Sequence, residues 1–126
     1  MKHFDLKIKI DSFTDLWGKH TLVFPVCSSE TANDGLLPFG AVIASATLKV
    51  YSGYIDEKTD ISTATLVPDI IDGTPIVVSP NKVTFFVQHP GATYANIKAT
   101  LIVEITLTDG GKNTFYGEGI YIGWSD

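Results

Sequence analysis

The residues that could do chemistry in this chain are three histidines, one cysteine, several loop carboxylates and a glycine pair. His3, His20 and His89 lie far apart and form no HxH or HExxH pattern, whereas a zinc site needs three or four convergent ligands. Cys27 lies in the apolar stretch LVFPVC, where a small buried residue is expected and not a nucleophile. These residues predict no metal site, no cofactor and no disulfide within the chain.

The carboxylates gather in two loops, at residues 56–60 and at residues 69–72. A glycosidase would place two acids across a cleft and would raise the pKa of one of them. Acids at turns more commonly serve as caps and solvating groups. No GxSxG elbow or other arrangement of nucleophile and base is present. We therefore expect no catalytic residues and predict that the chain is not an enzyme.

The stretch Asp109, Gly110 and Gly111 could be a gripping loop or a hairpin turn. A phosphate-binding loop would precede a helix, and a calcium loop would offer several alternating carboxylates. Here an alternating strand pattern stands on both sides, and glycines suit tight turns. We therefore predict a structural turn. Strict alternation after it would place two sets on opposite faces: Phe115, Gly117, Gly119, Tyr121 and Gly123 against Tyr116, Glu118, Ile120 and Ile122.

The charge of the chain argues against nucleic acid as a partner. Fourteen acidic residues and nine lysines give a net charge of −5, and there is no arginine. Arginine is the usual bidentate ligand of phosphate and guanine, and the lysines are scattered singly. No direct contact with nucleic acid is therefore expected.

Export and membrane insertion are also not expected. The first thirteen residues, MKHFDLKIKIDSF, carry charges throughout and contain no apolar run of signal-peptide length. No segment approaches the roughly 20 apolar residues of a membrane-spanning helix. Synthesis in the cytoplasm without a membrane partner is the expectation.

The elements that must position these residues are strands. Residues 3–10, 20–27, 41–51, 62–66, 75–78, 82–88 and 101–122 carry strand patterns, and the last range contains the hairpin. Turn signals recur about every 8–12 residues, and no convincing helix is present. With 44% hydrophobic residues and no linker, residues 1–126 predict one domain. The expected fold is all-β, a single-domain antiparallel β-sandwich with about seven to nine strands and a C-terminal hairpin.

Two regions are candidates for contact with other molecules. Residues 1–12 predict an edge strand or arm, and such strands can pair with a neighbouring subunit. The expected subunit interface consists of Phe4, Leu6, Ile8, Ile10, Tyr116 and Trp124. The aromatic residues could instead include a platform for stacking sugars: Tyr51, Tyr54, Tyr94, Tyr116, Tyr121, Trp17 and Trp124. Packing in the core and at interfaces is the simpler interpretation. For Glu104, the simplest placement is on the outer face of its strand.

The stretch GAVIASATLKV, followed by VTFFVQHPGATYANIKATLIVEITLTDGGKNTFYGEGIYI, resembles a group of small tailed-bacteriophage virion proteins. In that group an IASATV strand is followed by a V-F-V-GG-T-Y stretch, a strand ending in T-DG and a final hairpin arm. The resemblance covers roughly residues 36 to 122, and the core region of the domain that it defines extends to residue 124. HPGATYANI stands where the group has a double-glycine turn, and FGA stands where it has GD before the IASA strand. The first 35 residues have no clear counterpart.

The resemblance implies an immunoglobulin-like β-sandwich encoded among head and connector genes. It implies a structural protein of the virion, assembled in the host cytoplasm, and above all a capsid decoration or cement protein that bridges subunits. Its partners would be the major capsid protein, other virion proteins or further copies of itself as a homo-oligomer. A neck or tail component is an alternative, and so is an exterior carbohydrate- or receptor-binding module. An exposed aromatic pair beside polar residues would favour the binding module.

Overall fold

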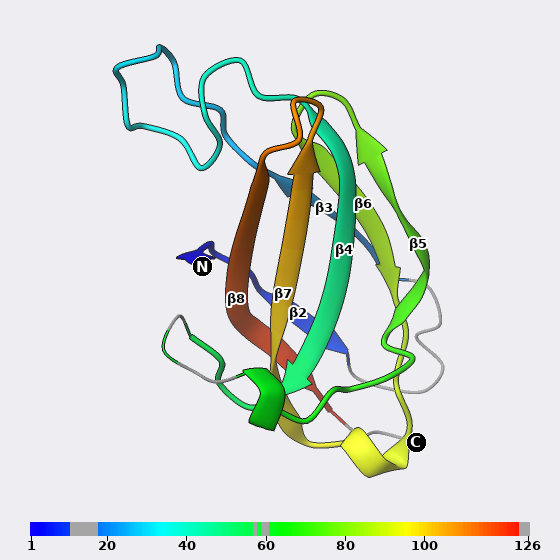
Figure 1. The fold of residues 1–126 in the computed structure, drawn as a ribbon. Coiled ribbons are helices and arrows are strands. Elements are labelled where there is room, and N and C mark those ends of the chain that lie inside the picture. Colours follow the sequence, from blue (N-terminus) through cyan, green and yellow to red (C-terminus); the bar gives the residue numbers. More distant parts are fainter. Residues whose placement is uncertain (11–17, 57, 59–60, 124–126) are drawn as a thin grey trace.

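The computed structural model describes residues 1–10, 18–56, 58 and 61–123, and in this part of the chain the secondary structure is almost entirely β (Figure 1). The strands are β1 (Lys2–His3), β2 (Ile8–Ile10), β3 (Gly18–Val23), β4 (Ile43–Ser52), β5 (Ile71–Val78), β6 (Lys82–Val87), β7 (Ile97–Leu107) and β8 (Lys112–Ile122). Two short 3-10 turns, η1 (Ile61–Thr63) and η2 (Ala92–Tyr94), lie in the connections. The predicted all-β class is confirmed.

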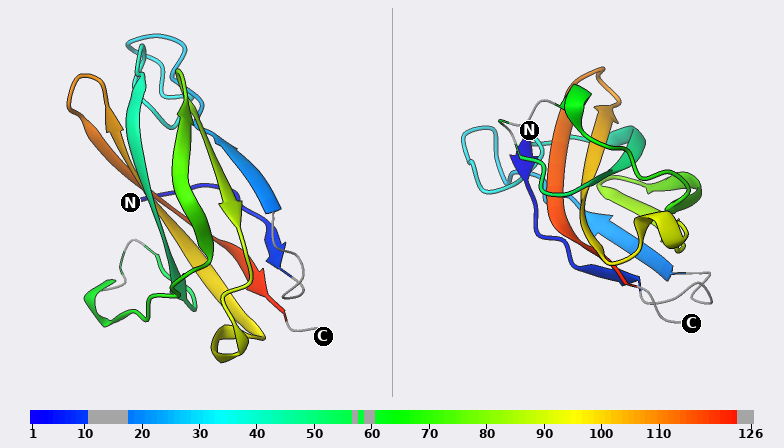
Figure 2. Two further views of the ribbon diagram at one scale, coloured as in Figure 1. Left: turned by 90° about the vertical axis from the view of Figure 1, so that its right-hand side faces the viewer. Right: turned by 90° about the horizontal axis from the view of Figure 1, so that it is seen from below.

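The strands form two sheets that pack face to face, as Figures 1 and 2 show. Sheet A has the order β1–β8–β7–β4, and β2 lies beside β8 on the same edge as β1. Sheet B has the order β3–β6–β5. The pairings between these strands are antiparallel except those of β1 and β2, which run parallel to β8. The β-sandwich prediction is therefore confirmed.

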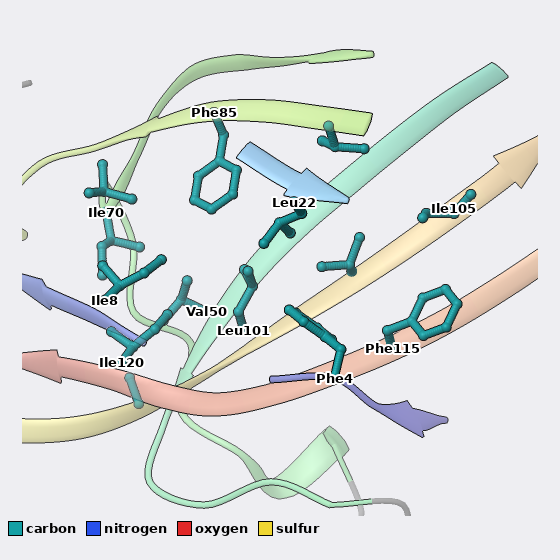
Figure 3. Packing of buried hydrophobic residues seen from close by; sticks show 14 of the residues in the cluster. Phe4, Ile8, Leu22, Val50, Ile70, Phe85, Leu101, Ile105, Phe115 and Ile120 are labelled. Atoms are coloured by element: carbon teal, nitrogen blue, oxygen red, sulfur yellow. The ribbon is translucent and has the colours of Figure 1, made fainter. Parts of the chain in front are cut away.

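The core lies between the sheets and draws on the inner face of each (Figure 3). The central strand β7 contributes Leu101, Val103 and Ile105, which point inward and are almost completely buried. Aromatic rings join the layers: the Phe24 ring centroid lies 5.0 Å from that of Phe115. Burial of these apolar side chains is the main source of stability in such a sandwich.

The N-terminal strand is broken in two, whereas the sequence predicts one strand over residues 3–10. Between β1 and β2 the chain passes over Gly117 and Gly119 of β8. A Cβ atom on Gly119 would overlap the carbonyl oxygen of Leu6, so the close approach depends on glycine at that position. Phe4 N donates to Tyr116 O (3.0 Å) within this crossing.

The Asp109–Gly111 segment is the turn of the β7–β8 hairpin, as predicted. Gly110 N donates to Leu107 O (2.9 Å), and Leu107 N donates to Gly111 O (2.8 Å). Gly111 N also donates to the Asp109 carboxylate (2.8 Å). Gly110 has a φ of 90°, which favours glycine, whereas Gly111 has no positive φ. Gly110 is therefore the position in the turn where the backbone conformation requires glycine.

The alternation expected for β8 is wrong beyond Gly117. Gly117 lies opposite Leu101, but Ile120 lies opposite Ala99, so β8 carries one extra residue at this point. This β-bulge reverses the faces of the following residues. Ile120 and Ile122 therefore enter the core, while Tyr121 is 39% exposed on the outer face.

Other boundaries differ from the sequence predictions for local reasons. The second predicted strand, 20–27, is β3 (18–23) and stops before Pro25, whose carbonyl accepts the N–H groups of Leu36 and Leu37. The strand predicted at 62–66 is wrong: residues 62–63 belong to the 3-10 turn η1, and Leu66 makes an isolated bridge with Tyr51. The predicted strand at 75–78 is the second half of the longer β5. The strands predicted at 41–51 and 82–88 are confirmed as β4 and β6.

Candidate functional site

The outer face of sheet A is covered in part by the segment that follows β4 (Figure 1). Gly53 N donates to Lys98 O (2.8 Å), which fixes the start of the segment on β7. The Thr100 hydroxyl donates to Gly53 O (2.7 Å) and accepts from Ile55 N (3.1 Å). Thr100 is fully buried and Ile55 is 3% exposed, so this attachment excludes water. One hydroxyl thus satisfies the buried N–H group of Ile55 and also bonds to the carbonyl group of Gly53.

This attachment holds Tyr54 beside the bulge in β8 and forms a cleft of about 590 Å³. We call it the tyrosine cleft; it is lined by Gly53, Tyr54, Lys98, Glu118, Gly119, Ile120 and Tyr121. Tyr54 is 61% exposed and Tyr121 is 39% exposed, so both rings are accessible. The bulge places Tyr121 on this side, and bulges commonly redirect side chains at binding sites.

The charged groups of the tyrosine cleft come from both of its sides. Glu118 contributes a carboxylate, and His3 Nε2 lies 2.7 Å and 3.0 Å from its two oxygens. The His3 ring also packs edge-on against Tyr116, with centroids 5.2 Å apart. Lys98 is exposed on the β7 side. Among its described lining residues, the cleft therefore combines two aromatic rings with one anionic and one cationic side chain, an arrangement suited to binding a ligand.

The three histidines lie in different surroundings, and the structure does not bring them together. His20 stacks on Phe85 (5.8 Å between centroids), and burial lowers its pKa from the usual 6.5. His89 Nε2 lies 2.6 Å from Gly123 O, and its Nδ1 accepts from Gly91 N (3.0 Å). Among the described residues, no three His, Cys, Asp or Glu side chains could share a metal ion. Cys27 is partly buried.

Asp56 and Asp34 bond to backbone N–H groups of their own loops, whereas Asp69 precedes β5 and Asp72 lies within it. Asp56 accepts from Lys58 N (2.8 Å), and Glu57 and Asp60 lie outside the described residues. The sequence did not single out Asp34, which accepts from the Ser28 hydroxyl (2.6 Å) and from Ser28 N (2.9 Å). These bonds lower the pKa of the Asp34 carboxyl group. All of these contacts are those of loop-stabilising groups.

The residues expected at a subunit interface take several positions. Phe4, Ile8 and Ile10 are buried in the core of their own chain, at 8%, 3% and 3% exposure. The physical reason is that β1 and β2 pair with β8 of the same chain, which turns these side chains between the two sheets. Leu6 and Tyr116 are half-buried, and Trp124 lies outside the described residues. Phe4, Ile8 and Ile10 are therefore not accessible to another subunit in this structure. Contact with another subunit through other residues of the segment 1–12 stays a prediction.

Glu104 is exposed on the outer face of sheet A, as expected, where it lies opposite Thr47 and Thr114. No buried partner is needed for a carboxylate in that position.

The outer face of sheet B forms a second accessible surface. Val23 on β3 and Ile76 and Val78 on β5 point outward and are 52%, 53% and 45% exposed. Val78 and Val23 both lie opposite Lys82 of the central strand β6. We call these three side chains the sheet B apolar face, and no described segment of the chain covers them.

Comparison of the chain with protein-family models, with curated proteins and with solved structures gave no match. Within the described residues, no helix has the length and apolar character required to cross a membrane.

Proposed function

We propose that the chain is a non-enzymatic structural protein of a tailed-phage virion, a decoration or cement protein that stabilises the head by bridging capsid subunits. The arrangement of its strands supports an immunoglobulin-like fold of the kind that the resemblance implies. If β3 to β8 are taken as strands B to G, sheet A contains the G–F–C order and sheet B contains B–E–D. The fold alone does not define a role, so the argument depends on surfaces.

The observation that carries the proposal is the sheet B apolar face. Its three β-branched side chains, Val23, Ile76 and Val78, are about half exposed on one side of a three-stranded sheet. Removing apolar area from water contributes roughly 25 cal/mol per Å², which is the energy that a bridging protein can use. Decoration by such a surface needs no chemistry, because binding to the assembled state alone stabilises it.

The charge of the chain supports an exterior position. A net charge of −5 and the absence of arginine suit a surface remote from packaged DNA. The partners would be the major capsid protein or other virion proteins.

The test uses tailed-phage heads assembled without this protein, to which purified protein is added back. We expect saturable binding and a higher temperature of head rupture, with copies located on the head by electron cryo-microscopy. Ile76→Glu on the sheet B apolar face should abolish binding, whereas Ser45→Glu, at an exposed position of β4, should bind as the unchanged protein does. Density at the neck or tail, or equal binding of both variants, would contradict the proposal.

A second candidate function is an exterior carbohydrate- or receptor-binding module, and the tyrosine cleft favours it. Tyr54 and Tyr121 are two exposed aromatic residues that line the same cleft as Lys98 and Glu118. Aromatic rings stack on the C–H faces of pyranoses, while charged side chains bind hydroxyl groups at the rim.

Its test is a glycan array followed by NMR titration with the best ligand. Tyr54→Ala and Tyr121→Ala should each weaken binding at least tenfold. The control is Phe39→Ala, which removes an exposed aromatic ring (54%) that does not line the cleft. Absence of any glycan ligand, or equal weakening by the control, would exclude this function.

A further inference from the structure

The four edges of the two sheets differ in how they are protected against pairing with another chain. An unprotected edge presents free backbone N–H and C=O groups, and proteins usually block such edges with bulges, prolines, charges or covering segments. In sheet A, the β1/β2 edge is divided into pieces of two and three residues, with exposed Lys7 between them. So short and interrupted an edge is a poor template for a further strand.

The β4 edge of sheet A is covered at both ends. Val67 N donates to Val50 O and Ser52 N donates to Thr65 O, both at 2.8 Å, so residues 65–67 lie along the end of this strand. At the start of the strand, Ile43 N donates to Pro80 O (2.8 Å).

The β5 edge of sheet B is irregular. Its pairing with β6 shifts between Asp72 and Ile76, and Gly73 within the shift has a φ of 77°. Pro75 stands in the same stretch and has no N–H to donate. This edge therefore carries two of the usual protective features.

Among the described residues, the β3 edge has no bulge, no proline and no segment bonded along it, and its one protective feature is the charge of Lys19. Its six residues pair with β6 in unbroken register, from Gly18 opposite Val87 to Val23 opposite Lys82. The strand contains no proline and no bulge, and β6 is the single described strand beside it. Lys19 is its one charged residue that is always ionised near neutral pH.

We propose that the β3 edge pairs antiparallel with the β3 edge of a second copy of this chain, with Thr21 facing Thr21 across the two-fold axis. The two B sheets then join into one continuous sheet of six strands. The inference concerns self-association and does not depend on the virion function.

The sequence of β3 selects this occupant because the strand is complementary to itself in that register. Residues directly opposite in an antiparallel pair point to the same face, so Lys19 faces Val23 of the second copy. No like charges are opposed, and the aliphatic stem of Lys19 covers the Val23 side chain, which is 52% exposed in the single chain. At the axis, two threonine hydroxyls face each other, which is a favourable cross-strand pair.

The inward-facing residues fit the same register. His20 lies opposite Leu22 of the second copy, at the rim of a groove of about 490 Å³ between β3 and the N-terminal segment. Phe4, Leu22 and Leu36 give this groove apolar walls. A second strand along β3 covers the rim and removes part of this apolar area from water.

The register makes a disulfide test possible in a Cys27→Ser background, which removes the one native cysteine. Thr21→Cys places two sulfurs directly across the axis, where Cα atoms of opposed residues lie about 4.5–5.5 Å apart, within disulfide range. Lys19→Cys is the matched control, because Lys19 is also exposed and lies on the same strand. Its two copies would lie about 13 Å apart in this register. We expect rapid oxidation to a covalent dimer for Thr21→Cys and none for Lys19→Cys, whereas equal rates would overturn the proposed pairing.

Solution mass gives an independent measurement on the unchanged chain. Sedimentation at about 100 µM should give a species of twice the 13.7 kDa chain mass. Thr21→Lys puts two like charges at the axis and should raise the dissociation constant of the dimer at least tenfold. Thr74→Lys on the β5 edge should leave the dissociation constant unchanged. A monomer at this concentration would overturn the proposal. The β3 edge would then be a candidate for pairing with a segment of another protein.

Discussion

The two sheets of this sandwich differ in what covers them. Sheet A is covered by segments of its own chain: residues 53–56 cross its outer face, and residues 2–10 close the edge beside β8. Sheet B has no such cover among the described residues, either on its outer face or along β3. Side chains on the outer face of sheet A therefore contact other parts of the same chain where residues 53–56 cross it. The sheet B apolar face is accessible to other molecules.

This comparison predicts that substitutions of equal chemistry act differently in the two sheets. In sheet A they should reduce the free energy of unfolding, since each contact is made within the chain. At the exposed outer-face positions of sheet B they should leave stability almost unchanged, because such positions away from special features usually contribute within about ±0.5 kcal/mol.

The largest effect is expected at Gly119, where sheet A meets its N-terminal cover. Gly119→Ala should lower the free energy of unfolding by about 3 kcal/mol, because a Cβ atom would overlap the Leu6 carbonyl group and displace the backbone. Gly53→Ala is the control: its Cβ atom would meet nothing within 4 Å, and its only cost is a φ of 85°, which alanine rarely adopts. Urea denaturation measures the free energy of unfolding of both variants. Equal midpoints would show that residues 4–7 are not in close contact with β8.

The next effect compares two buried threonines on the outer faces of the sheets. Thr100→Val should cost about 2 kcal/mol, because Gly53 O and Ile55 N both lose the hydroxyl that satisfies them. Thr84→Val in sheet B should be nearly neutral, although Thr84 is only 7% exposed, because its hydroxyl meets only the exposed Thr21 (3.1 Å). Thermal unfolding of both variants measures the difference, and a similar loss in each would contradict the comparison.

A smaller effect is expected in the turn of sheet A. Gly110→Val should cost about 1–2 kcal/mol, since a β-branched residue is strained at a φ of 90°. Gly111→Val should cost less because its φ is not positive, and Lys112→Ala, at an exposed position, should cost least. The order of the three urea midpoints is the measurement, and a reversed order would mean that the turn residue is misplaced.

The smallest effect concerns pH and lies in sheet B. Burial lowers the pKa of His20 below its usual 6.5, so the folded chain takes up a proton less readily than the unfolded chain. The contribution of the neutral ring is complete above about pH 6.5 and is lost progressively as the pH falls below that value. His20→Gln should flatten the fall in stability between about pH 7 and 5. An unchanged slope in denaturation curves across this range would exclude His20 as the cause.

The class of the fold could be predicted because its strands carry plain local signals. The alternation in residues 101–107 and the glycines after Asp109 required no knowledge of distant contacts to predict a hairpin. The break in the N-terminal strand could not be predicted in the same way. Its cause is the approach of Leu6 to Gly119, which joins residues more than a hundred positions apart.

Sequence analysis could identify the aromatic residues of the tyrosine cleft but not the cleft itself. Tyr54 and Tyr121 were visible as aromatic residues, but their meeting depends on two non-local features. One is the bulge in β8, which turns Tyr121 outward, and the other is the hydroxyl of Thr100, which fixes the segment carrying Tyr54. Neither a bulge nor a side-chain anchor has a periodicity that sequence patterns reveal.

The position of the N-terminal strand beside β8 has a consequence for the order in which the chain folds during synthesis. His3 and Glu118, which meet at this edge, are 115 positions apart, so residues 2–10 leave the ribosome long before their partner strand exists. Contacts between such distant residues are slow to form. Phe4, Ile8 and Ile10 therefore cannot pack beside β8 until that strand has been synthesised, so the part of the core that they fill is completed late. Until then the nascent chain exposes an apolar edge that is vulnerable to aggregation.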